Sequence, residues 1–539
     1  MTLPSPSGPV SPPTRSARAW HAELAWLPGL GVLPNVLIEA TGERFSAVTA
    51  AVSGDAVPAG TIRLAGLTMP GLANGHSHAF HRALRGTTGS SRERVLATGL
   101  GSGADGLSGV TAGAGPVGEA DLGSFWTWRE RMYQVAERLG PDSYRALARA
   151  VYAEMALAGI ACVGEFHYVH HGPGGRRYDN PNAMSLALID AAAQAGLRIT
   201  LLDTCYLSGG LDSSGGSLPL DGPQLRFADG TAEGWAKRIG QLGADEHGKL
   251  GSTARVGAAI HSVRAVPPEQ MPVVAAWTHR AGAPLHVHLA EQVAENESCL
   301  AAYRATPTAV LYDAGVLGPR TTVVHATHVS AADVKLLGGS EVFACVCPTT
   351  EAELADGIGP FGALAAAGCR LTVGSDSQAV IDLFEEARRI ELYQRLASGR
   401  SGWFGPESLG RAVTWEGHAS LGWPDAGEIA PGSLADLVTV SLDSVRLAGV
   451  RAGAGTALGV GGAPGAGVAP AAWPSVSPGA GESPAPDLAA LHGVMFAASS
   501  ADVRNVVIGG RDVVADGRHL LVDDVPGALR AAVRAVLGG

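Results

Sequence analysis

Residues 67–78 form the stretch LTMPGLANGHSH, in which an apolar run is followed by two histidines separated by one residue. The run Leu67–Leu72 has the composition of a buried strand. Side chains two apart on a strand face the same side, so the imidazoles of His76 and His78 can reach one ion. By itself the pattern is weak, because polar residues also end strands for structural reasons. Its position after an apolar strand and Pro70-Gly71 strengthens the metal interpretation.

Further strand-like segments follow at regular intervals, and Ala-rich helical stretches such as Asp142–Ala158 and Ala183–Ala195 lie between many of them. Eight strand-then-helix units predict an α/β fold, a TIM-like parallel (β/α)8 barrel over residues 67–426. The other seven expected strands are Ala161–Phe166, Arg198–Leu202, Val256–Ile260, Pro284–Leu289, Thr321–Val324, Val342–Val346 and Arg370–Val373.

Polar side chains that suit a metal also follow the fifth, sixth and eighth expected strands. Residues 285–291 are LHVHLAE, with His288 and Glu291 three apart, and His286 faces the same side as His288, so spacing alone leaves both open as ligands. His325 follows a β-branched pair, and Asp376 ends the eighth strand. Chemistry in such barrels sits at the carboxyl ends of strands. Four sites at such ends favour a metal centre over unrelated rim residues.

The chain ends have a different composition from the barrel. Residues 1–18 are rich in Pro and Ser and are expected to be disordered. Residues 19–66 and 427–539 contain short β-like runs, and we expect them to form one composite β-sandwich domain. A Gly-, Ala- and Pro-rich stretch at about 452–486 is predicted to be a disordered insertion within it.

Composition narrows the classes of partner. The net charge is −11, and the basic residues are scattered, so we expect neither nucleic acid nor an anionic membrane as a partner. The first 20 residues lack the apolar segment of a signal peptide, and no run reaches the roughly 18 apolar residues of a membrane span. These features predict a cytoplasmic protein, for which we also expect a homodimer.

The order His-x-His, His-x-x-Glu, His and Asp resembles the amidohydrolase superfamily, in particular its mononuclear deaminase branch. The metal ligands that this resemblance implies are His76, His78, His288 and Asp376. It also implies that Glu291 and His325 handle protons, together with Asp376. Residues 256–266 are VGAAIHSVRAV and hold no lysine, where binuclear relatives carry a bridging carboxylated lysine. We therefore expect one Zn²⁺ per chain.

Four longer strings are similar to the formimidoylglutamate deiminase family within that superfamily: FWTWRERMY (125–133), GEFHYVHH (164–171), HSVRAV (261–266) and CPTTE (347–351). The substrate contacts implied by this resemblance are Arg129, Tyr168, His261 and Arg264. Two guanidiniums can pair with two carboxylates, which agrees with that substrate class. His81 stands where the family carries a substrate-binding glutamine, and we retain it as a contact, since imidazole can also donate a hydrogen bond.

The resemblance implies hydrolysis of the small molecule N-formimidoyl-L-glutamate to N-formyl-L-glutamate and ammonia, a step of histidine degradation. Glu291 would carry a proton to the leaving nitrogen, and either Asp376 or His325 would be the base. One alternative is a deaminase of a heterocycle such as guanine, another purine or a pterin, which shares the metal set. Another is a non-catalytic barrel that acts as a scaffold, which would be expected to have lost metal ligands.

Overall fold

The computed structural model describes residues 17–27, 29–86, 125–212, 216–245, 250–450 and 487–538. The predicted disorder before residue 17 and at 452–486 lies outside these residues. Ala17 and Arg18, expected to belong to the disordered terminus, instead begin a strand, because they pair with Thr41 and Ala40. Among the described residues, no helix is both long enough and apolar enough to cross a bilayer.

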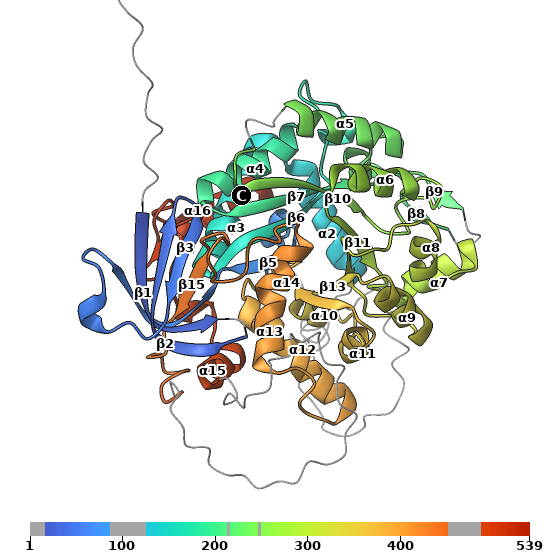
Figure 1. Cartoon of the computed structure of the whole chain (residues 1–539). Helices are drawn as coiled ribbons and strands as arrows, with labels where there is room; N and C mark the ends of the chain where they lie inside the picture. The colour runs from blue at the N-terminus through green and yellow to red at the C-terminus, as the bar shows by residue number, and fades with distance from the viewer. Residues whose placement is uncertain are drawn as a thin grey trace, which may run out of the picture.

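Eight parallel strands form the barrel that the sequence predicts, in the order β5 to β14 around its wall (Figure 1). The wall closes where Ser77, at the end of the first strand, bridges to Asp376 after the last. The barrel strands are β5 (Leu72–Ser77), β6 (Ile160–His167), β7 (Arg198–Cys205), β10 (Ala254–Ile260), β11 (Leu285–Leu289), β12 (Thr321–His325), β13 (Phe343–Val346) and β14 (Arg370–Val373).

The first barrel strand differs from the expected Leu67–Leu72. Residues 67–70 are the end of β4 (Ile62–Pro70), a strand of the second sheet, and β5 begins only at Leu72. The expected domain boundary at residue 67 therefore falls inside β4. Gly71 makes the transition possible, because a Cβ there would lie 2.6 Å from the Cβ of Ala161. The apolar composition of residues 67–72 does not show that residues 67–70 belong to one sheet and Leu72 to another.

Helices follow the barrel strands and cover the outside of the wall (Figure 1). The expected helices 142–158 and 183–195 correspond to α3 and α4. The described α-helices are α2 (Phe125–Arg138), α3 (Pro141–Leu157), α4 (Ala183–Ala195), α5 (Ala232–Asp245), α6 (Met271–Ala281), α7 (Val293–Tyr303), α8 (Pro307–Asp313), α9 (Ala331–Gly339), α10 (Pro348–Glu353), α11 (Phe361–Ala366), α12 (Leu383–Ser398), α13 (Pro406–Val413), α14 (Trp415–Ser420), α15 (Ala489–Ala497) and α16 (Val525–Leu537).

A second sheet is built from both chain ends, as predicted, and lies beside the barrel (Figure 1). It runs β18-β17-β16-β15-β4-β1-β2-β3, and Trp20, Ile38 and Leu437 are among the residues of its core. Its strands are β1 (Ala17–Leu27), β2 (Gly31–Thr41), β3 (Arg44–Thr49), β4, β15 (Leu437–Val440), β16 (Val503–Ile508), β17 (Arg511–Ala515) and β18 (Arg518–His519). A separate two-stranded ribbon pairs β8 (Gly210–Leu211) with β9 (Ser217–Leu218).

A buried ion pair joins the two sheets. The Nε atom of Arg198, on β7, lies 2.7 Å from Oδ2 of Asp436, and neither side chain is exposed. The Asp436 carboxylate also accepts a hydrogen bond from the backbone N–H of Gly509. A buried carboxylate with these partners is fully compensated, so this contact fixes the composite domain against the barrel.

Candidate active site

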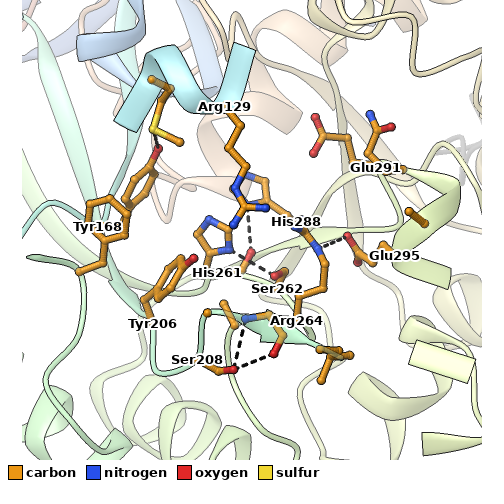
Figure 2. A pocket seen from close by; sticks show the side chains of 18 of the residues that line it. Arg129, Tyr168, Tyr206, Ser208, His261, Ser262, Arg264, His288, Glu291 and Glu295 are labelled. Carbon is orange, nitrogen blue, oxygen red and sulfur yellow. Dashed lines mark hydrogen bonds and ion pairs between the residues drawn. The ribbon is translucent and has the colours of Figure 1, made fainter. Parts of the chain in front are cut away.

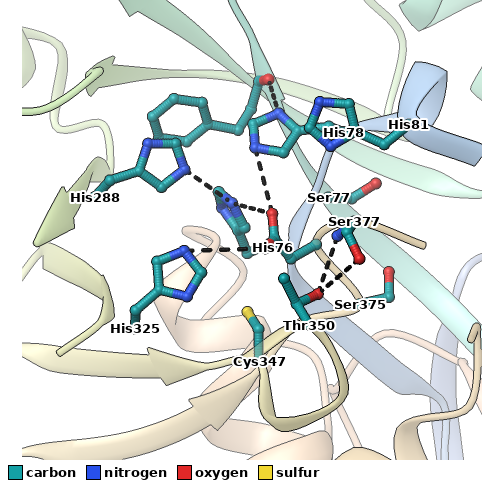
Figure 3. Close-up of polar contacts among 12 residues, drawn as sticks. His76, Ser77, His78, His81, His288, His325, Cys347, Thr350, Ser375 and Ser377 are labelled. Atoms are coloured by element: carbon teal, nitrogen blue, oxygen red, sulfur yellow. Dashed lines mark hydrogen bonds and ion pairs between the residues drawn. The ribbon is translucent and has the colours of Figure 1, made fainter. Parts of the chain in front are cut away.

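Three histidines, His76, His78 and His288, gather at the carboxyl end of the barrel (Figure 3), and Asp376 lies among them. Nε2 of His76 lies 3.2 Å from Oδ1 of Asp376 and 3.2 Å from Nε2 of His288. Nε2 of His78 lies 3.5 Å from the same Asp376 oxygen. His76 lies on β5 and His288 lies on β11. His78 directly follows β5, and Asp376 lies just beyond the end of β14. The predicted ligand set is thus brought together from three strands.

Glycine allows the first and last strands to approach at this point. A Cβ on Gly374 would lie 2.7 Å from the Cβ of His76, closer than real side chains pack. Two residues later, Asp376 has a φ of +39°, a left-handed backbone that is costly for a residue with a side chain. The Ser77–Asp376 bridge holds it there. Barrel closure therefore sets the direction of the aspartate.

Backbone carbonyls orient two of the imidazoles. Nδ1 of His78 lies 2.9 Å from the carbonyl oxygen of Phe166, and Nδ1 of His288 lies 2.9 Å from that of His261. A ring nitrogen facing a carbonyl must carry the proton, so both Nε2 atoms are left with lone pairs directed at the cluster. This is how metal-ligating histidines are usually held.

The charge states also suit a cation. Burial lowers the pKa of His76, and it lowers the pKa of His78 and His288 well below the usual value, so these rings are neutral. Burial would raise the pKa of Asp376, but the hydrogen bond to His76 and the nearby imidazoles hold it well below its ordinary range. Three neutral imidazoles and one carboxylate form a donor set of the kind that zinc binds.

Glu291 and His325 lie beside this cluster. Nε2 of His325 is 3.8 Å from Oε1 of Glu291 and 3.9 Å from Oδ2 of Asp376. Burial raises the pKa of Glu291 to about 7. Burial opposes protonation of His325, but Glu291, Glu351 and Asp376 together raise its pKa well above the usual value. Glu291 can therefore exchange a proton near neutral pH, whereas the carboxylates around His325 favour its protonated form.

Glu351 supports His325 from behind. Its Oε1 atom lies 3.5 Å from Nδ1 of His325 and accepts a hydrogen bond from the backbone N–H of Cys347. Glu351 ends the string CPTTE, and no role in the site is predicted for it from the sequence. Glu351 is far from His325 in the sequence, so no local pattern indicates that the two side chains are in contact.

A cavity of about 340 Å³ opens in front of the cluster. Arg129, half-buried on α2, and Arg264, after β10, line it together with Glu291 (Figure 2). Its wall includes nearly all the residues predicted for the site: His78, His81, Arg129, Tyr168, His261, Arg264, His288, Glu291, His325 and Asp376. His76 lies beneath them, fully buried. Two guanidiniums thus share one cavity with the metal-type cluster.

Tyr133 and Tyr206 complete the wall on the side of Arg129, and the Gln224 amide joins these two tyrosines. The Nε–H of Arg129 donates to Oη of Tyr133 at 2.7 Å, and the Gln224 amide donates to Oη of Tyr133 and of Tyr206 at 3.1 Å each. Sequence reasoning did not identify Tyr206 and Gln224. Tyr206 directly follows β7, so the strand-end rule used for the other residues was a signal that could have found it.

His81 also lines the cavity, with Nε2 3.2 Å from Oη of Tyr168. Burial lowers the pKa of His81 to about 3, so the ring is neutral. A neutral imidazole can donate one hydrogen bond, as the amide of a glutamine would.

Two other histidine groups do not join the cluster. His286, left open by spacing, lies deeper in the barrel, where its Nε2 contacts the carbonyl oxygen of Ser420 at 3.1 Å. His167 and His170 lie near Asp203, but that carboxylate already accepts hydrogen bonds from other groups. Its donors are Arg238, Trp235 and Ser185. We therefore assign no metal to that group.

The fold and cluster agree with comparison to known proteins. Residues 67–513 match the model of the amidohydrolase family, and the chain belongs to that family. It is therefore a hydrolase of the amidohydrolase type, with deaminases among its relatives.

Two relatives and two solved structures illustrate the similarity. A formimidoylglutamate deiminase of Pseudomonas aeruginosa is 34% identical over 93% of this chain and 95% of that enzyme. An 8-oxoguanine deaminase of the same organism is 33% identical over 60% of this chain and 69% of that enzyme. The structure of an amidohydrolase from Brucella melitensis superposes with a TM-score of 0.78 at 29% identity, covering 96% of this chain and 100% of that chain. A zinc-bound adenosine deaminase from Xanthomonas campestris, at 20% identity, shares the fold with a TM-score of 0.72, covering 98% and 99% of the two chains.

Proposed function

We propose that the chain is a zinc-dependent formimidoylglutamate deiminase, which hydrolyses N-formimidoyl-L-glutamate to N-formyl-L-glutamate and ammonia in histidine degradation. The observation that carries the proposal is the cavity in which Arg129 and Arg264 accompany the metal-type cluster. The substrate has two carboxylates and one amidine. Guanidiniums recognise carboxylates through paired, charge-assisted hydrogen bonds.

One zinc ion per chain would be held by His76, His78, His288 and Asp376, the donor set described above. Bound there, zinc supplies the Lewis acidity that makes water a nucleophile near neutral pH. His325 or Asp376 accepts the proton of the attacking water. Glu291, whose pKa is about 7, delivers a proton to the amidine nitrogen so that it leaves as ammonia.

Arg129 and Arg264 bind the substrate carboxylates in this proposal, and Tyr168 and His261 add directional hydrogen bonds. We assign to His81, which lies beside Tyr168, the hydrogen-bond-donating role that a glutamine amide would have at this position. The exclusion of a second metal rests on residues 256–266, which offer no lysine. The expected homodimer and cytoplasmic location stay predictions.

A deaminase of a heterocycle is the second candidate. It is favoured by the similarity to the 8-oxoguanine deaminase and by aromatic side chains in the cavity wall, among them Trp128, Tyr206 and Phe227. Flat rings stack on such side chains. Two arginines in the same cavity suit a substrate with two carboxylates better than a neutral ring.

A substrate panel tests the proposal. Ammonia release would be measured with N-formimidoyl-L-glutamate, guanidino amino acids, guanine, 8-oxoguanine and isoxanthopterin. We expect turnover of the formimidoyl compound and little release from the heterocycles. Turnover of a heterocycle alone would replace the proposed function by the second candidate.

A further inference from the structure

Glu295 is a buried carboxylate in the wall of the cavity. It lies in the first turn of α7, four residues after Glu291, and its side chain has no exposed surface. A buried carboxylate is costly unless its oxygens accept hydrogen bonds. Oε2 lies 3.0 Å from Nε of Arg264, and Oε1 accepts from the backbone N–H of Ala290 at 3.1 Å. Each oxygen thus has a different partner.

The first contact determines which edge of Arg264 is available. A guanidinium can pair with a carboxylate through its Nε edge or through its two terminal nitrogens. Glu295 takes the Nε edge (Figure 2). Among the described residues, the terminal nitrogens of Arg264 donate to no protein acceptor, and the side chain lines the cavity. A substrate carboxylate would therefore meet the end of the guanidinium.

The second contact, from the backbone N–H of Ala290 to Glu295, lies next to Glu291, the proposed proton carrier. Ala290 has a φ of +48°, a left-handed backbone that an alanine rarely adopts. It directly precedes Glu291, so its conformation sets where the Glu291 side chain begins. The hydrogen bond from its N–H to Glu295 helps to hold that conformation.

We propose that Glu295 is a positioning residue that fixes Arg264 for end-on binding of a substrate carboxylate and holds Glu291 at a set distance from it. The inference rests on the proposed function. It differs from a merely structural ion pair in one respect: the effect of Glu295 on substrate capture must pass through Arg264.

Glu295→Gln tests this, because Arg264 and Ala290 donate to different oxygens of Glu295 and an amide keeps only one of those two acceptors. We expect kcat/KM for N-formimidoyl-L-glutamate to fall about 10- to 100-fold, mostly through KM, with zinc content and melting temperature retained. In an Arg264→Ala background, the same change should alter KM by no more than about twofold. Glu295→Asp, which keeps the charge but shortens the side chain, provides a second cycle should the Gln variant fold poorly.

Glu391→Gln is the matched control. Glu391 on α12 is equally unexposed and accepts from Arg395, Gly402 and Phe404, but it does not line the cavity. It should leave KM unchanged. An unchanged KM in folded Glu295→Gln would overturn the inference, and so would losses in KM that add fully to those of Arg264→Ala. A wild-type protein that releases no ammonia from the formimidoyl substrate would overturn the proposed function and the inference with it.

Discussion

Glu291 and His325 face each other across 3.8 Å, next to an aspartate whose pKa is held low. The groups differ in charge preference because their surroundings differ. Burial favours the neutral form of Glu291, whereas three carboxylates favour the protonated form of His325. Such a pair can deliver one proton while stabilising the charge that develops nearby.

Glu291→Gln tests the proton-carrying role. The amide keeps the size of the side chain but cannot transfer a proton, so kcat should fall roughly 10²- to 10⁴-fold. Zinc content, measured by elemental analysis, should stay at the wild-type level. A kcat within a few-fold of the wild type, with Glu391→Gln as the control for loss of a buried carboxylate, would contradict the assignment.

The two arginines should act on capture of the substrate. Arg129→Ala and Arg264→Ala each remove a charge-assisted contact, and we expect kcat/KM to fall by roughly 10- to 150-fold, mainly through KM. An analogue lacking one carboxylate should be poor for the wild-type enzyme. One of the two variants should have nearly the same kcat/KM for the analogue and for the full substrate. If neither variant narrows that difference, the arginines do not bind the carboxylates.

At the level of elements, buried polar contacts fasten helices to the barrel wall. Asp203 on β7 accepts from both terminal nitrogens of Arg238, on α5, at 2.8 and 2.7 Å, and from Nε1 of Trp235 at 3.0 Å. Burial would raise the pKa of Asp203, but the charge of Arg238 and these hydrogen bonds lower it to about 2. The charged form is therefore the stabilising one.

This shift predicts a pH dependence of stability. Because the pKa in the folded protein lies below the ordinary 3.8, the contribution is fully present above about pH 4 and is lost as the pH falls through about 2. It amounts to about 2 kcal/mol of the free energy of unfolding. The difference in melting temperature between wild type and Asp203→Asn should therefore shrink between pH 4 and 2.

The control for this measurement is an exposed pair of the same chemistry. Arg18 and Asp512 lie 2.7 Å apart with 41% and 27% of their side chains exposed, so Asp512→Asn should cost less than about 1 kcal/mol. A difference for Asp203→Asn that does not change with pH would show that the carboxylate is not held as described.

On the scale of the whole molecule, one centre collects residues from strands that are far apart in the sequence. His76 and Asp376 are brought together only when the barrel closes. The composite domain is fastened to the same barrel through Arg198 and Asp436. A metal ion held by this cluster would therefore require the complete fold.

Metal content tests this centre directly. We expect about one zinc per chain in purified protein, and His288→Ala should lose the metal and the activity together. His286→Ala is the matched control, since that residue lies two positions earlier on β11 but bonds to the Ser420 carbonyl instead. The control should keep the metal. Two equivalents per chain, or retention of zinc by His288→Ala, would contradict the single four-ligand centre.

The sequence by itself determined the barrel and the residues at its carboxyl end. Strand composition and spacing are local, and parallel strands share one edge, so side chains that end different strands must meet. This reasoning located His76, His78, His325 and Asp376 without knowledge of any contact. The family resemblance added Arg129 and Arg264.

Only the tertiary structure decided how those residues are held. It assigned residues 67–70 to the second sheet, and it separated His288 from His286, which spacing could not do. It also revealed Glu295 behind Arg264 and Glu351 behind His325. These contacts join segments that lie 26 or more residues apart, and a buried carboxylate carries no local pattern that names its partner. Burial and packing choose that partner, and both arise only when the whole chain has folded.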